Sequence, residues 1–143
     1  MKPLLAVIAL MASSYTASSQ EGAIIRCGAS KGTSYFFHDQ ITNKDGPKWS
    51  DDGMSKGKIN LVRLGSEWDI MFDDAIDSYS YRRDGATVIL LGQTPRFLTV
   101  GAFFQSKYAD IYTFDLEGKE VAWTSSKIGT LLPKVGVYRA SCE

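Results

Sequence analysis

The two cysteines of this chain constrain its fold more than any other feature. Cys27 lies near the start of the part that can fold, and Cys142 is the penultimate of 143 residues. If they form a disulfide, the first strand lies beside or opposite the last one. A meander that closes into a barrel requires this neighbourhood, and two sheets pinned face to face also satisfy it. Two buried free thiols are the remaining alternative.

The first 19 residues have the three-part pattern of a secretory signal peptide. After a basic start, residues 3–12 form an apolar run of about ten residues, and Ala17 and Ser19 provide the small side chains that cleavage needs. A membrane-spanning helix needs roughly 20 apolar residues, about twice this run. We predict that residues 1–19 are cleaved and that 20–143 form a single exported domain, periplasmic or secreted and without stable membrane insertion. Such compartments favour disulfides.

The charge balance excludes one class of partner. The chain has 16 Lys and Arg residues against 16 Asp and Glu residues. This balance provides no long-range attraction toward nucleic acid, so we expect no nucleic-acid partner.

Short runs of alternating apolar and polar residues indicate strands throughout the mature chain. In residues 67–73, for example, Trp68, Ile70 and Phe72 share one face. Asp84-Gly85 and Glu117-Gly118 have the spacing of two-residue hairpin turns. The pattern predicts an all-β fold, an antiparallel meander closing as a small barrel of about 8–10 strands, with a β-sandwich as the alternative. The predicted strands are 23–27, 33–38, 58–64, 67–73, 76–83, 86–91, 96–104, 109–116, 119–125 and 135–142.

One segment matches the G-x-S-x-G motif of α/β-hydrolases. It runs from Gly28 to Gly32, with Ser30 at its centre. The motif needs a following helix and a distant histidine, whereas here a strand pattern follows and the sole histidine, His38, is eight residues from Ser30. We therefore interpret the segment as a glycine-rich turn and assign no catalytic residue.

Carboxylates cluster at Asp73, Asp74 and Asp77, which could supply three oxygen ligands to calcium. Their spacing matches no EF-hand or repeat loop. One histidine and two cysteines predicted to be oxidised do not assemble a zinc site without carboxylate help. We predict no metal site and no cofactor.

Aromatic residues are the remaining candidates for a binding site. Segment 39–58 is the longest stretch without a strand pattern, and long loops over a barrel mouth commonly carry function. We predict ligand or partner contacts from Trp49 on this loop and from Tyr35, Phe37 and Tyr108. The expected partner is an unidentified protein or a small apolar ligand.

The run Cys-Gly-Ala-Ser-Lys-Gly from Cys27 to Gly32, the turn at 49–53 and the strand at 111–114 resemble a group of small exported proteobacterial proteins that has no characterised activity. The resemblance implies a compartment and a lineage, but no functional residues. In size and in a disulfide near the ends, the chain is more loosely similar to periplasmic lysozyme-inhibitor barrels, by analogy only.

Three functions are compatible with these features. A non-catalytic binding or inhibitor module, using an aromatic surface or cavity and the 39–58 loop, is the first prediction. A small secreted hydrolase acting on an envelope or extracellular substrate, with Ser30, His38 or the acidic loops involved, is the alternative. A structural envelope component is the third.

Overall fold

The computed structural model describes residues 22–73 and 78–143, which form ten strands and one short helix. Asp74 and Asp77, two of the three carboxylates considered for calcium, lie outside the described residues. The elements are β1 (Gly22–Phe36), β2 (Lys48–Asp52), β3 (Lys58–Leu64), β4 (Glu67–Asp73), β5 (Ser78–Ser80), α1 (Tyr81–Asp84), β6 (Thr87–Gln93), β7 (Phe97–Phe104), β8 (Tyr108–Asp115), β9 (Glu120–Lys127) and β10 (Lys134–Cys142).

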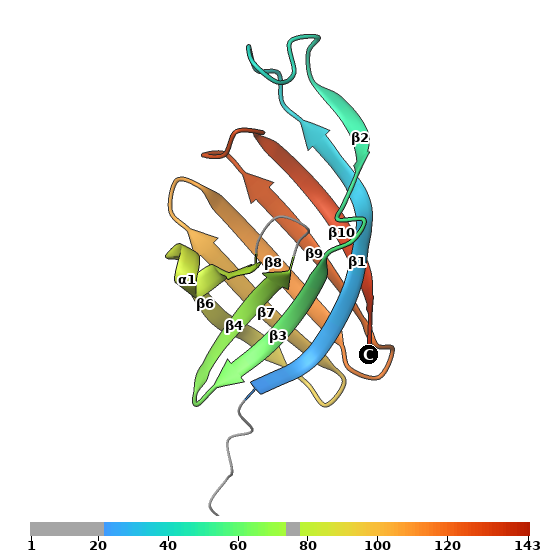
Figure 1. Cartoon of the computed structure of the whole chain (residues 1–143), viewed down its shortest axis with the longest axis vertical. Helices are drawn as coiled ribbons and strands as arrows, with labels where there is room; N and C mark the ends of the chain where they lie inside the picture. The colour runs from blue at the N-terminus through green and yellow to red at the C-terminus, as the bar shows by residue number, and fades with distance from the viewer. Residues whose placement is uncertain (1–21, 74–77) are drawn as a thin grey trace, which may run out of the picture.

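All described strands belong to one antiparallel sheet. Its order is β5-β4-β3-β1-β10-β9-β8-β7-β6, and β2 pairs with β1 off this path. The sheet curls into an open, barrel-like shape (Figure 1). Helix α1 contacts β4 and β5 near one edge of the sheet and β6 at the other edge. The all-β, barrel-like meander predicted from the alternating pattern is therefore confirmed.

Strand β1 is long enough to pair with two strands along one of its edges. Its first half pairs with β3 and its second half with β2, while its other side pairs with β10. The prediction of two strands separated by a turn at Gly28–Gly32 is wrong, because these residues lie within β1. Gly32 pairs with Tyr138 of β10, and a Cβ atom there would lie 2.7 Å from the Tyr138 ring. This glycine therefore serves close packing and not a turn.

The hairpin of β1 and β2 extends beyond the rest of the barrel (Figure 1). Segment 39–58 was predicted to lack a strand, but it contains β2, and Trp49 lies in that strand opposite Tyr35. The pattern missed this strand because nearly all of its side chains are exposed, so no apolar alternation marks it.

The predicted strand 76–83 and its hairpin turn at Asp84-Gly85 are wrong in part. Residues 76 and 77 lie outside the described part of the chain; within it, Ser78–Ser80 form a strand and the residues that follow form helix α1. The Ser80 hydroxyl caps the helix by accepting a hydrogen bond from the Arg83 amide. Gly85 ends the helix with a φ of 102°, a left-handed conformation that favours glycine.

The second predicted hairpin turn is placed correctly but is longer than expected. Strand β8 ends at Asp115 and β9 begins at Glu120, so residues 116–119 form the connection. The Asp115 carboxylate accepts from the backbone amides of Glu117 and Gly118, at 3.2 and 2.8 Å. A side chain that satisfies turn amides in this way stabilises the longer connection.

The disulfide joins the strands that the cysteine positions predicted. Cys27 of β1 and Cys142 of β10 are cross-strand partners and are covalently bonded. The C-terminus lies at the end of the barrel opposite the β1–β2 hairpin (Figure 1). A disulfide persists in an oxidising compartment, so it is compatible with export.

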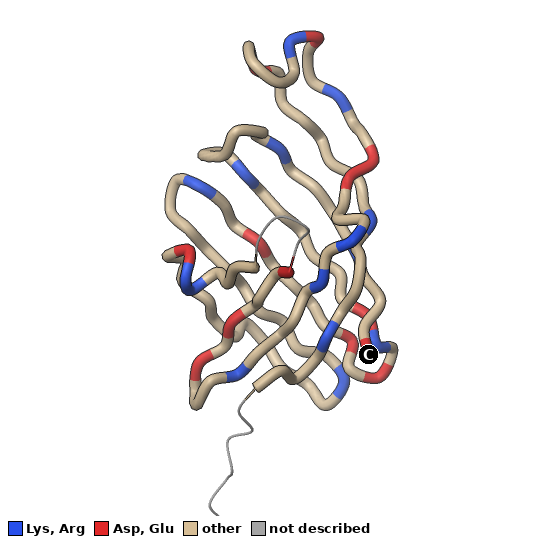
Figure 2. The backbone as a smooth tube through the Cα atoms, viewed as in Figure 1, with Lys and Arg blue, Asp and Glu red and all other residues tan. Residues whose placement is uncertain are grey.

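The apolar core lies inside the curled sheet. Its fully buried side chains include Ile59, Leu61, Ile70, Val100 and Phe114. Basic and acidic residues are interspersed along the described chain (Figure 2), in keeping with its balanced charge. In the part of the chain that the structure describes, no helix has the length and apolar character needed to cross a membrane.

Candidate functional site

A row of stacked aromatic rings forms the floor of a polar cavity inside the barrel. Tyr112, Trp123 and Tyr138 are buried cross-strand partners on β8, β9 and β10. The ring centroids lie 5.3 Å apart between Tyr112 and Trp123, and 5.2 Å apart between Trp123 and Tyr138. The ring planes are inclined by 22° and 24°, which is favourable for offset stacking. The stack therefore provides a well-packed floor.

The next inward-facing layer, toward the β1–β2 hairpin, is polar. Asp110 of β8 pairs with Ser125 of β9, and the same layer continues to Gly136 of β10 and Ser34 of β1. A Cβ atom at Gly136 would lie 2.3 Å from the Ser34 Oγ atom. The absence of a side chain at this position therefore leaves room for the Ser34 hydroxyl.

Asp110 is a deeply buried ionisable group of this layer, with 2% of its surface exposed. The Tyr81 hydroxyl donates to its Oδ2 atom, and the Tyr112 hydroxyl oxygen lies 2.5 Å from that of Tyr81. Burial raises the pKa of the Asp110 carboxyl above its usual range. Among the described residues, Asp110 Oδ1 and Ser125 Oγ form no hydrogen bond of normal geometry, although the Ser125 hydroxyl lies near enough to the Asp110 carboxyl to oppose the rise in its pKa. Two buried polar atoms on paired residues are thus left without a well-formed hydrogen bond.

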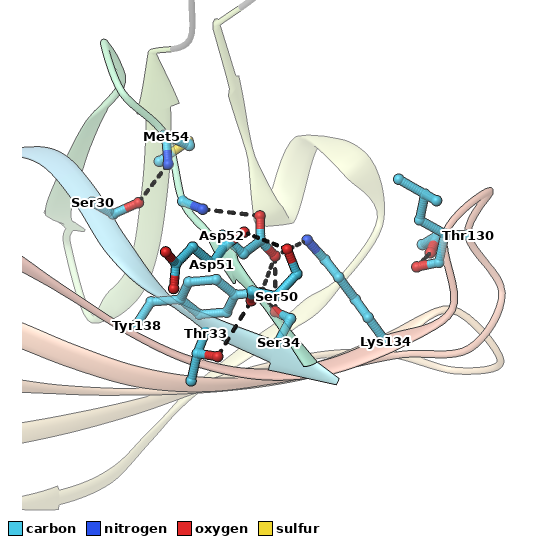
Figure 3. Close-up of polar contacts among 12 residues, drawn as sticks. Ser30, Thr33, Ser34, Ser50, Asp51, Asp52, Met54, Thr130, Lys134 and Tyr138 are labelled. Carbon is cyan, nitrogen blue, oxygen red and sulfur yellow. Dashed lines mark hydrogen bonds and ion pairs between the residues drawn. The ribbon is translucent and has the colours of Figure 1, made fainter. Parts of the chain in front are cut away.

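Asp52 organises another wall of the cavity. Its Oδ2 atom accepts hydrogen bonds of 2.8 Å from Ser34 and from Tyr138, and it forms an ion pair with Lys134 (Figure 3). Partial burial opposes the charged form, but the hydrogen bonds from Lys134, Tyr138 and Ser34 outweigh it and lower the pKa of Asp52 to about 2. Asp52 is therefore an anion that neutralises Lys134 and ties β2 to β10.

Lys127 brings a second ammonium group to the cavity. It is the cross-strand partner of Lys134 and follows Ser125 by two residues, so both belong to the inward face of β9. Among the ion pairs of residues 22–73 and 78–143, none involves Lys127, whereas Lys134 is paired with Asp52. The cavity therefore holds one neutralised and one unpaired cation.

These groups line a cavity of about 180 Å³. Aromatic side chains contribute much of its wall, and Asp52, Asp110, Ser125, Lys127 and Lys134 all face it. The volume is below the roughly 300–1,000 Å³ of pockets for drug-sized ligands, so the space suits a compact molecule.

The residues predicted from the sequence as binding contacts fall into two groups. Tyr35, Phe37 and Trp49 form a ring cluster on the β1–β2 hairpin, with centroids 5.3 Å apart for Tyr35 and Phe37 and 5.4 Å apart for Tyr35 and Trp49. Tyr108 belongs to β8, where its ring contacts Tyr81 and its hydroxyl donates to Asp84. The structure therefore brings the first three together and places Tyr108 on another strand.

Ser30 lies within β1, far from His38. The Ser30 hydroxyl accepts a 2.9 Å hydrogen bond from the backbone amide of Met54 (Figure 3). His38 is exposed and lies beyond the end of β1. About 20 Å of strand separates Ser30 from that end, at roughly 3.3 Å per residue. The G-x-S-x-G segment thus positions the chain that follows β2 and does not form a nucleophile elbow.

Several polar residues that line the cavity were not predicted as site residues from the sequence, namely Asp52, Asp110, Ser125, Lys127 and Lys134, and neither was Ser34, which donates to Asp52. The alternation of inward and outward residues along the strands contains a signal for some of them. On β9 the inward positions run Val121, Trp123, Ser125 and Lys127, so the apolar face becomes polar toward one end. The same change occurs on β8, where Asp110 continues the inward face of Tyr112. When the inward faces of neighbouring strands change from apolar to polar toward the same end, the sequence indicates a polar cavity at that end of a barrel.

A comparison with protein families, with characterised proteins and with solved structures finds no match for this chain. The resemblance to small exported proteobacterial proteins therefore stays a prediction.

Proposed function

We propose that this chain is an exported, non-catalytic binding protein that holds a small ligand in the cavity above the aromatic floor. The observation that carries the proposal is the pair of unsatisfied atoms, Asp110 Oδ1 and Ser125 Oγ, on paired and buried residues that line one cavity. The signal sequence predicted in residues 1–19 and the disulfide support export to the periplasm or the medium.

The energetic cost of these atoms favours a ligand site over a purely structural role. A buried polar atom without a partner costs about 1–3 kcal/mol, so folded proteins retain few of them. An alanine in place of Ser125 would avoid this cost without leaving a large void. A ligand with hydrogen-bonding groups satisfies both atoms when it binds, and the pair then contributes to affinity and orientation.

The exposed rings of the hairpin support a second contact in the same module, with a protein partner. Trp49 is 67% exposed, and the nearby loops expose Ile41 and Leu131 by 76% and 77%. The Phe37 amide donates to the Pro133 carbonyl at 3.2 Å, which joins the loop after β1 to the loop before β10. Aromatic and aliphatic side chains gathered in this way are typical of protein interfaces.

The hydrolase alternative has less support in the geometry. Ser34 is the serine with a carboxylate and an ammonium group in its network, through Asp52 and Lys134. Its side chain is fully buried, at 0% exposure, so a substrate carbonyl would not reach it. A nucleophile must be accessible to the reacting atom.

Native mass spectrometry of the mature protein, gently isolated from its exported compartment, tests the ligand-binding function. We expect an extra mass on the wild type that corresponds to one compact small molecule, in keeping with the size of the cavity. Ser125→Phe fills the cavity and should abolish the extra mass, whereas Thr124→Phe places the same bulk on the outer face of β9 and should retain it. A bare wild-type mass, or equal loading of both variants, would contradict the proposal.

A further inference from the structure

The deep end of the cavity has the character of a cation site. Asp110 Oδ1 forms no hydrogen bond of normal geometry among the described residues, and the Ser125 hydroxyl beside it can also accept a hydrogen bond from a ligand. Aromatic rings surround this end, with Tyr81 lying 5.2 Å from Phe72 and 6.0 Å from Tyr112 between centroids. A carboxylate among ring faces is a favourable environment for an ammonium group, through ion pairing and cation–π attraction.

The outer part of the cavity has the opposite character. Lys127 faces it without an ion-pair partner among the described residues, and the neighbouring Lys134 is already neutralised by Asp52. A ligand that carried only an ammonium group would therefore meet an uncompensated positive charge. A ligand that carried only an acid group would neutralise Lys127 but would bring no positively charged donor to the Asp110 carboxylate.

Strand geometry sets the spacing of the backbone positions at the two ends of the cavity. Asp110 and Ser125 are cross-strand partners, and Lys127 lies two residues further along β9 on the same face. Two residues of strand span roughly 6–7 Å. No ion pair within the described chain joins Lys127 to Asp110, although both line the cavity. A molecule with separated charges fits between them.

We propose that the cavity binds a small zwitterion, with its ammonium group at Asp110 and Ser125 and its acid group at Lys127. This inference rests on the proposed ligand-binding function and specifies the chemical class of the ligand. The ligand carries its two charges on separate groups, one for each end of the cavity. The aromatic floor of Tyr112 and Trp123 contacts the part of the ligand between them.

Three matched probes test this assignment by isothermal titration calorimetry on the mature, oxidised protein. The zwitterion 4-(aminomethyl)benzoate carries both groups, benzylamine carries the ammonium group alone, and benzoate carries the acid group alone. We expect the zwitterion to bind at least tenfold more tightly than either of the other two. Equal affinity for benzoate or for benzylamine would overturn the assignment.

Two variants assign each charge to its residue. Asp110→Asn should lower the affinities for the zwitterion and for benzylamine at least tenfold and leave the affinity for benzoate unchanged. Lys127→Met should reduce the affinity for the zwitterion to that for benzylamine. Lys44→Met removes a lysine of the exposed loop after β1 and should leave all three affinities unchanged. An Asp110→Asn protein that binds the zwitterion as well as the wild type would overturn the assignment.

The outcomes separate this inference from the proposed function. If a native ligand without both charges copurifies with the wild type and is lost in Ser125→Phe, the binding function stands and the zwitterion assignment fails. If no ligand copurifies and no probe binds, both fail. Circular dichroism and a thermal melt of each variant show that it is folded before its affinities are compared.

Discussion

Arg82 donates a hydrogen bond of 2.8 Å to the backbone carbonyl of Val88, and this contact joins helix α1 to strand β6. The same guanidinium donates through Nε to the carbonyl of Trp68 in β4, at 2.7 Å. Strands β4 and β6 approach each other, but no backbone ladder joins them among the described strands. Arg82 therefore closes the seam between the two sides of the curled sheet.

Arg82→Met should destabilise the fold by about 2–3 kcal/mol, because two carbonyl groups lose a charged donor. Urea unfolding of the mature protein measures the change. Amide hydrogen exchange should also accelerate in β6, which loses its link to β4. Arg83→Met is the matched control, since Arg83 is exposed and neighbours Arg82 on the same helix. Equal stabilities of the two variants would show that Arg82 does not hold the seam.

Most of the sheet could be predicted from the sequence because its inward face is apolar and its period is regular. Strands β3 and β4 occur at the predicted boundaries, and the cysteine pair correctly places β1 beside β10. The prediction failed where packing overrides local pattern. Gly32 indicates a turn by itself, but in the fold it accommodates the ring of Tyr138 within a continuous strand.

The candidate site was less predictable because its residues come from strands that are distant in sequence. Asp52 and Lys134 lie 82 residues apart and meet only through the pairing of β1 with both β2 and β10. Trp49 was chosen for its place in a long loop, and the structure puts it on an exposed hairpin next to Tyr35. Local sequence supports the surface cluster but carries no information on which inward positions face one another.

Two buried serines of the cavity layer should respond oppositely to truncation. Ser125→Ala should leave the free energy of unfolding unchanged or raise it by up to about 1 kcal/mol, because it removes an unsatisfied hydroxyl. Ser34→Ala should lower it by about 2 kcal/mol, because Asp52 and Tyr138 lose a partner. Parallel urea titrations compare the two. A large loss for Ser125→Ala would indicate a structural hydroxyl and would weaken the proposed ligand site.

Asp52 should make the protein sensitive to acid. Its pKa is lowered to about 2 in the folded protein, from an unfolded value of 3.8, so its ion pair stabilises the fold above about pH 4 and the contribution is lost as the pH falls toward 2. After allowance for solvent screening the contribution is about 1 kcal/mol. The difference in unfolding free energy between the wild type and Asp52→Asn should therefore shrink from pH 7 to pH 2.

Asp51→Asn provides the control for this pH dependence. Asp51 lies next to Asp52 on β2 but is exposed. Its substitution should leave the difference from the wild type small and nearly constant over the same range. Asp115, whose pKa is also lowered to about 2, is present in all three proteins, so the comparison isolates Asp52. A constant difference for Asp52→Asn would contradict the prediction.

Removal of the disulfide should lower the stability of the mature protein more than any single substitution above. The bond joins residues 115 positions apart, and a crosslink across so long a loop stabilises by roughly 4–5 kcal/mol by restricting the unfolded chain. Urea unfolding of the double variant Cys27→Ala/Cys142→Ala measures this loss. Dithiothreitol should reduce the stability of the wild type to the level of the variant and leave the variant unchanged. A double variant within about 1 kcal/mol of the oxidised wild type would show that the pairing of β1 with β10 holds the barrel without the crosslink.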